Sequence, residues 1–183
     1  MIPSDVFREV PVLVGEQVRL EPLTEAVLED YLAAIADPEV RRLTGGSDHH
    51  ERGTVAHWLA TRADHHDRAD WAAVRISDGA FVGEAVLNQL DIANASANFR
   101  ILLAGPHVFG KGHGTEMTRL AVDHGFAVGL HRISLTVFAF NPRARRVYER
   151  CGFVVEGRLR DALYQDGSWH DDILMSVLRS DPR

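Results

Sequence analysis

Hydrophobic and polar positions alternate in some segments, which predicts strands, and recur about every 3.6 residues in others, which predicts helices. Strand-like patterns cover residues 18–23, 71–76 and 81–87, and Ser77-Asp78-Gly79 favours a turn that joins the last two as a hairpin. Helical spacing follows Thr24, a suitable N-cap, and recurs over residues 51–66. Asp37-Pro38 is expected to end the first helix, and residues 41–48 are expected to form a loop.

The second half of the chain also alternates between predicted strands and predicted helices. Residues 96–103, 133–138, 153–159 and 169–177 are predicted strands, and residues 115–128 have helical spacing. Asn141-Pro142 combines an N-cap with a first-turn proline and opens another helix, which ends near Gly152. The order β-α-α-β-β-β-α-β-α-β-β predicts an α/β fold with about seven strands in a mixed sheet and about four helices on its faces. No repeat or linker is visible, so residues 1–183 are expected to form a single domain.

Composition narrows the classes of partner. The formal net charge of −6 argues against a nucleic-acid binder and suits a cationic partner such as an amine. No apolar run reaches the roughly 20 residues of a membrane helix, and the first residues do not resemble a signal peptide. The lone Cys151 cannot form an internal disulfide. These features predict a cytoplasmic protein with no membrane partner.

A glycine-rich loop between a strand and a helix is the strongest chemical signal. Gly110, Gly112 and Gly114 allow successive backbone N–H groups to turn toward one point, and the following helix adds the positive end of its dipole. A pyrophosphate suits such a cradle, although a turn that only connects the two elements is the plain alternative. Neither the P-loop pattern nor the dinucleotide fingerprint G-x-G-x-x-G fits here.

Two motifs in the right order resemble the GNAT superfamily of N-acetyltransferases. Residues 109–114 resemble its coenzyme A loop, R/Q-x-x-G-x-G/A, with Phe109 in place of the usual Arg or Gln. Residues 141–153 resemble its later segment, N-x-x-S/A-x-x-x-Y-x-x-x-G-F. Residues 18–23 and 156–160, with Asp166-Gly167, resemble the branch that contains ribosomal-protein N-terminal acetyltransferases. The resemblance covers a core of about residues 18–178.

This resemblance implies a GNAT-like fold with a mostly antiparallel, twisted sheet. It also implies an acyltransferase that moves an acetyl group from acetyl-coenzyme A to a primary amine by direct attack in a ternary complex. Because the branch often forms dimers, a homodimer is one expected assembly. The residues expected to bind the coenzyme are Leu102, Leu103, Ala104, Phe109, Gly110, Lys111, Gly112, His113, Gly114, Thr115, Asn141 and Arg143.

The reaction needs a base for the amine and an acid for the departing thiolate. Tyr148 matches the family's general acid, and its alternative role is that of a core aromatic residue. The base stays open among Glu84, Asp91, His113 and a water chain. Glu84 could equally be a surface residue of the hairpin, and His113 could be exposed to solvent. The acceptor also stays open among a protein N-terminus, a polyamine-like metabolite and an amino sugar.

Other functions are weaker alternatives. A non-catalytic acyl-coenzyme A sensor on the same fold would bind the thioester without releasing thiol, and a nucleotide-binding protein would use the same loop for ATP or NAD. The histidines near the second helix lack a metal-binding pattern and a Cys partner, so no metal is expected. That cluster comprises His49, His50, His57, His65 and His66.

Overall fold

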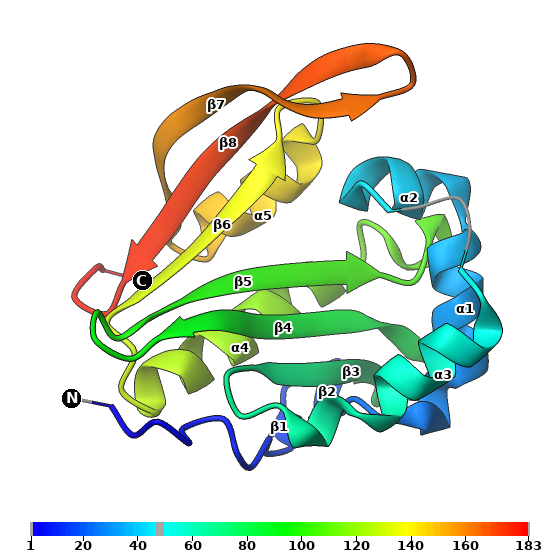
Figure 1. The fold of residues 1–183 in the computed structure, drawn as a ribbon, viewed down its shortest axis with the longest axis horizontal. Helices are drawn as coiled ribbons and strands as arrows, with labels where there is room; N and C mark the ends of the chain where they lie inside the picture. The colour runs from blue at the N-terminus through cyan, green and yellow to red at the C-terminus, as the bar shows by residue number, and fades with distance from the viewer. Residues whose placement is uncertain (1, 47–49, 183) are drawn as a thin grey trace.

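The computed structural model describes residues 2–46 and 50–182. In this part of the chain, eight strands form one sheet in the order β1-β2-β3-β4-β5-β6-β8-β7 (Figure 1). Only β5 and β6 run parallel, and every other neighbouring pair is antiparallel. The strands are β1 (Leu13–Val14), β2 (Val18–Pro22), β3 (Ala69–Arg75), β4 (Phe81–Asp91), β5 (Ser96–Leu103), β6 (Arg132–Phe138), β7 (Val154–Gln165) and β8 (Ser168–Leu178).

Helices cover both faces of the sheet. Helix α1 lies on one face of β4, where Tyr31 reaches Glu84, and α4 lies on the other, where a Cβ added at Gly125 would come within 3.2 Å of Leu87 Cδ1. In Figure 1, α1, α2 and α3 lie together at one end of the strands, and α4 lies behind the sheet. The helices are α1 (Leu28–Ala36), α2 (Pro38–Thr44), α3 (Arg52–Ala60), α4 (His113–Ala127) and α5 (Pro142–Arg150).

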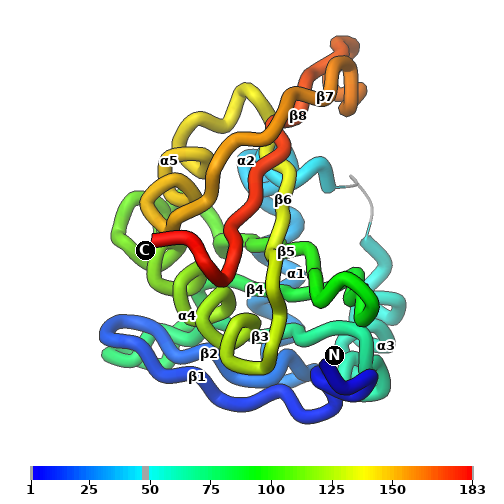
Figure 2. Tube along the Cα trace, turned by 90° about the vertical axis from the view of Figure 1, so that its left-hand side faces the viewer, coloured from blue at the N-terminus to red at the C-terminus, as the bar shows by residue number. Residues whose placement is uncertain are grey.

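The sheet opens between β5 and β6. Their parallel pairing is confined to Ser96–Asn98 against Arg132–Ser134, and no pairing continues toward Leu103 and Phe138. Figure 2, turned by 90°, shows that β6, β8 and β7 form a second wing that leans away from the β1–β5 wing. Beyond Asn98, therefore, the backbone edge of β5 that faces β6 has no strand partner among the described residues.

The predicted fold class is confirmed, with differences in several elements. The helix predicted over residues 51–66 ends at Ala60. Residues 41–44, predicted as part of a loop, belong to α2, because the Asp37 side chain accepts hydrogen bonds from the backbone N–H groups of Glu39 and Val40. Pro38 then starts a helix, at a position where its missing N–H costs nothing. Residues 47 and 48 of the predicted loop lie outside the described residues. The short strand β1 was also missed, since two residues carry no periodic signal.

Candidate active site

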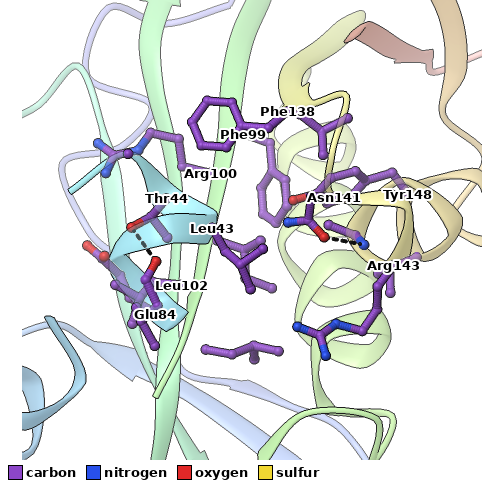
Figure 3. A pocket seen from close by; sticks show the side chains of 18 of the residues that line it. Leu43, Thr44, Glu84, Phe99, Arg100, Leu102, Phe138, Asn141, Arg143 and Tyr148 are labelled. Carbon is purple, nitrogen blue, oxygen red and sulfur yellow. Dashed lines mark hydrogen bonds between the residues drawn. The ribbon is translucent and has the colours of Figure 1, made fainter. Parts of the chain in front are cut away.

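A cleft of about 760 Å³ lies where β5 and β6 separate. Its lining comes from both wings of the sheet, from α1, α2 and α5, and from the loop that precedes α4. Figure 3 shows Glu84, Arg100 and Leu102 on one side of the cleft, with Asn141 and Tyr148 across from them. Chemical groups far apart in the sequence therefore face one cleft.

The glycine-rich loop supplies a row of backbone donors to this cleft. Gly110 and Gly112 adopt φ angles of 74° and 91°, a left-handed conformation that favours glycine. Among the described residues, none of the five N–H groups of residues 110–114 donates a hydrogen bond within the protein. They lie at the positive end of α4, a helix of 15 residues. The loop therefore has the geometry of an anion cradle.

The predicted coenzyme residues divide into two groups in the structure. The side chains of Lys111 and His113 and the residue Ala104 are not part of the cleft lining. His113 is buried instead, and burial lowers the pKa of its imidazole. The alternative of a solvent-exposed His113 is therefore wrong. The predicted residues that line the cleft are Leu102, Leu103, Phe109, Gly110, Gly112, Gly114, Thr115, Asn141, Arg143 and Tyr148.

Glu84 is a buried carboxyl group at the cleft. It lies on β4 opposite Leu102, only 3% of its surface is exposed, and the Tyr31 hydroxyl donates a hydrogen bond of 3.1 Å to its Oε2. Burial raises the pKa of Glu84 to about 7, while the positive charge of Arg100 opposes that shift. The alternative of a surface residue is therefore wrong. A carboxyl group that titrates near neutral pH suits proton transfer.

The pKa of Glu84 also predicts how stability depends on pH. An unfolded chain releases this proton near pH 4.5 and the folded chain near pH 7, so the folded state loses stability as the pH rises through that interval. The variant Glu84→Gln has no such loss. From pH 4 to pH 8, we expect its free energy of unfolding to gain roughly 3 kcal/mol relative to the wild type. Urea denaturation at several pH values measures this difference, and parallel pH curves for the two proteins would contradict it.

Tyr148 lies across the cleft from Glu84, on α5. Only 7% of its surface is exposed, and its ring packs edge-on against Phe99, with 6.4 Å between the ring centroids. Burial raises the pKa of the phenol, so the hydroxyl group keeps its proton through the physiological range. Tyr148 is thus a packed aromatic residue that also lines the cleft, and the two roles considered for it are compatible.

Asn141 and Arg143 shape the wall formed by α5. Asn141 is the N-cap of this helix, and its Oδ1 accepts a hydrogen bond of 3.1 Å from the backbone N–H of Ala144. The guanidinium group of Arg143 lies 4.2 Å from the centre of the Phe109 ring. Phe109 therefore holds a cation at the cleft, beside a loop whose amides favour anions.

We expect Asn141→Ala to lower the free energy of unfolding by roughly 1 kcal/mol, because it removes the cap of α5. Asn141→Asp keeps an oxygen acceptor at the same position and is the matched control. Chemical denaturation of the two variants measures the difference. Equal destabilisation by Ala and Asp would show that the cap contributes little.

Asp91 and Cys151 lie away from the cleft, whereas His50 is part of its lining. Asp91 accepts hydrogen bonds from Asn94 in the turn after β4 and does not line the cleft. Cys151 is buried outside the lining, and burial raises the pKa of its thiol to about 11, which disfavours a nucleophilic role. His49 lies outside the described residues, and within those residues no group of three metal-binding side chains occurs. None of the described helices is long and apolar enough to cross a membrane.

Two residues of the site were missed by the sequence analysis. They are Tyr31 of α1 and Arg100 of β5, and neither is among the residues predicted for the site. The signal for Arg100 was its position two residues before Leu102 on β5, which places it on the same face as Leu102. No sequence signal linked Tyr31 to Glu84, because 53 positions separate them.

Comparison with known proteins gives the same picture of the fold. Residues 17–154 match the model of the acetyltransferase (GNAT) domain family. A crystal structure of spermidine N-acetyltransferase from Vibrio cholerae, in complex with CoA and spermine, superposes with a TM-score of 0.84 at 23% identity, covering 91% of this chain and 98% of that one. A GNAT-family acetyltransferase from Bacillus anthracis superposes with a TM-score of 0.79 at 18% identity, over 92% and 98% of the two chains.

Similarity in sequence extends over part of several relatives. Spermidine N(1)-acetyltransferase from Vibrio cholerae is 36% identical over 100 residues, 54% of this chain and 57% of that protein. Its Escherichia coli counterpart is 31% identical over 115 residues, 62% of this chain and 61% of that protein. The ribosomal N-acetyltransferase candidate YdaF from Bacillus subtilis is 34% identical over 103 residues, 56% of each chain. The chain thus spans about three fifths of the length of the curated relatives it matches.

The family model covers three quarters of the chain, including the glycine-rich loop, β5, β6 and α5, and the fold agrees along nearly its whole length. This chain belongs to the GNAT acetyltransferase domain family.

Proposed function

We propose that this chain is an N-acetyltransferase that moves the acetyl group of acetyl-coenzyme A directly onto a primary amine. One observation carries the proposal: a single cleft brings together an anion cradle, a buried carboxyl group and a protonated phenol. These are the groups that acetyl transfer needs for binding the donor, for accepting a proton and for returning one. Family membership supports the same activity.

The loop and β5 fit the donor. Five free amides and the positive end of α4 suit the pyrophosphate of coenzyme A. The open edge of β5 beyond Asn98 offers backbone N–H and C=O groups to the amides of the pantetheine arm, beside Leu102 and Leu103. Arg143 adds a positive charge near the phosphates. The acetyl end then lies between Glu84 and Tyr148.

Glu84 and Tyr148 would divide the proton transfers. The Glu84 carboxylate accepts a proton from the incoming ammonium group, which frees the nitrogen lone pair for attack on the thioester carbon. A carbon–nitrogen bond forms, the carbon–sulfur bond breaks, and the Tyr148 hydroxyl gives its proton to the departing thiolate. The second proton lost by the nitrogen restores the tyrosine. A backbone N–H at the open edge of β5 would stabilise the oxyanion.

The acceptor is proposed only as a primary amine. Two relatives bear the name of spermidine acetyltransferases and a third that of a ribosomal N-acetyltransferase candidate, so these names favour polyamines and protein N-termini. Neither class follows from the fold, because related folds serve many acceptors. The chemistry of the acceptor has to be inferred from the cleft itself.

Thiol release from acetyl-coenzyme A tests the proposal. The assay uses a panel of alkylamines, polyamines, amino acids and N-terminal peptides, beside calorimetric titration with coenzyme A. We expect tight coenzyme binding and amine-dependent release of thiol. Binding without release across the panel would favour a non-catalytic sensor, and absence of binding would contradict the assignment of the loop.

A further inference from the structure

The charges that line the cleft are mostly positive. The described residues of the lining include one carboxylate, Glu84, and four arginines. The arginines are Arg41, Arg100, Arg143 and Arg150. This balance is opposite to the net charge of −6 of the whole chain, so it is a local property of the cleft.

Arg100 belongs to the side of the sheet where an acceptor would approach Glu84. In the pairing of β4 with β5, Glu84 lies opposite Leu102 and Val86 lies opposite Arg100. Alternate residues share a face, so Glu84 and Arg100 are diagonal neighbours with about 7–8 Å between their Cα atoms. This is the face that carries Tyr31 of α1, whereas α4, with the anion cradle at its start, packs against the opposite face.

The guanidinium group of Arg100 is available to a ligand. Within the described part of the chain, it forms no hydrogen bond or salt bridge, and the residue is exposed and belongs to the lining of the cleft. Figure 3 shows it on the same side as Glu84. Other arginines of the chain are paired, for example Arg68 with Asp70 at 2.6 Å and Arg75 with Asp78 at 2.5 Å. Arg100 is therefore a five-donor cation beside the carboxylate that would accept the proton of the amine.

We propose that the acceptor carries an anionic group in addition to its primary amine, and that Arg100 binds this group while the amine lies at Glu84. The inference rests on the proposed acetyl transfer. A carboxylate, phosphate or sulfate would form charge-assisted hydrogen bonds with the guanidinium group. A polyamine would instead bring a second positive charge toward Arg100, and like charges at this spacing repel each other.

The test compares amines of one length that differ only in their far end. The three probes are 4-aminobutanoate, 1,4-diaminobutane and butylamine, assayed for kcat/KM at about pH 8.5, where Glu84 is ionised. We expect the wild type to favour the aminobutanoate over the diamine by at least about tenfold. Arg100→Gln should remove this preference and Arg100→Glu should reverse it. The preference is measured as the ratio of kcat/KM for the aminobutanoate to kcat/KM for butylamine, because a change in the ionisation of Glu84 acts on both probes alike and cancels in the ratio.

Two further sets of probes determine the preferred chain length and the preferred anionic group. Amino acids and diamines with three to six carbons find the spacing that fits best, and O-phosphoethanolamine distinguishes a phosphate from a carboxylate. Preference for the diamines at every length, or an unchanged preference in both Arg100 variants, would overturn the inference and leave the acetyl transfer intact.

Binding separates this inference from the proposed activity. Calorimetric titration of the protein–coenzyme A complex with 4-aminobutanoate and with 1,4-diaminobutane needs no turnover. If the wild type binds the aminobutanoate and Arg100→Gln does not, the inference is supported even when no amine is acetylated. In that case only the proposed activity fails. Equal or stronger binding of the diamine would overturn the inference.

Discussion

Replacing Glu84 with Gln should lower kcat for acetyl transfer by about 10²–10³-fold, because the variant lacks a group that accepts the proton of the amine. The wild-type kcat/KM should fall as the pH drops below about 7, where the buried carboxylate becomes protonated and cannot accept another proton. In Glu84→Gln, the inflection near pH 7 should be absent. Steady-state kinetics between pH 5.5 and pH 9.5 measure both effects.

Glu84→Gln is a conservative test of this role. The amide oxygen can still accept the hydrogen bond from the Tyr31 hydroxyl, so the packing of α1 on β4 is preserved. Coenzyme A affinity should stay within about threefold, because the anion cradle lies on another element. A variant that keeps the wild-type kcat and the inflection near pH 7 would assign the proton transfer to water or to another group.

The second large effect is expected for Tyr148→Phe. The substitution removes only the hydroxyl group and leaves the aromatic packing against Phe99, so the fold should be unaffected. Without a proton for the departing thiolate, kcat should fall by roughly 10²-fold, while the KM for acetyl-coenzyme A changes by less than about threefold. Steady-state kinetics at saturating amine measure the two constants separately.

Two outcomes would contradict a proton-donating Tyr148. One is an unchanged kcat at every pH. The other is a rise in KM without any fall in kcat, which would make the hydroxyl a binding group for the donor. Thermal unfolding of the variant shows whether loss of activity has a structural origin, because a wild-type midpoint excludes disruption of α5.

Much of the fold could be predicted because local signals agree with it. Asn141-Pro142 marks the start of α5 by its own chemistry, an N-cap followed by a proline that needs no N–H donor. Residues 96–103 match β5 as the structure has it. Asp37-Pro38 ends α1 as predicted, and the same pair also begins α2, which was not predicted. The Asp37 side chain caps the new helix through its hydrogen bonds with the backbone N–H groups of Glu39 and Val40.

The site was predictable only in part. The glycine pattern indicates the anion cradle directly, since few other residues tolerate the φ angles at Gly110 and Gly112. The burial of Glu84 could not be predicted, because it depends on Tyr31 of a helix 53 residues away. The position of Arg100 beside Glu84 depends on the register of β4 with β5, which no local pattern encodes. The single domain and the homodimer stay predictions.

The fate of a labelled acetyl group tests acetyl transfer in this cleft most directly. The full chain is incubated with acetyl-coenzyme A that carries a ¹³C-labelled acetyl group and with an amine from the panel, and mass spectrometry follows the label on the amine and on the intact protein. We predict that the label moves to the amine, that it never accumulates on the protein, and that Glu84→Gln slows its transfer. Two results would contradict direct transfer. In one, coenzyme A binds but the label stays on the thioester with every amine. In the other, the label accumulates on the protein before it reaches the amine.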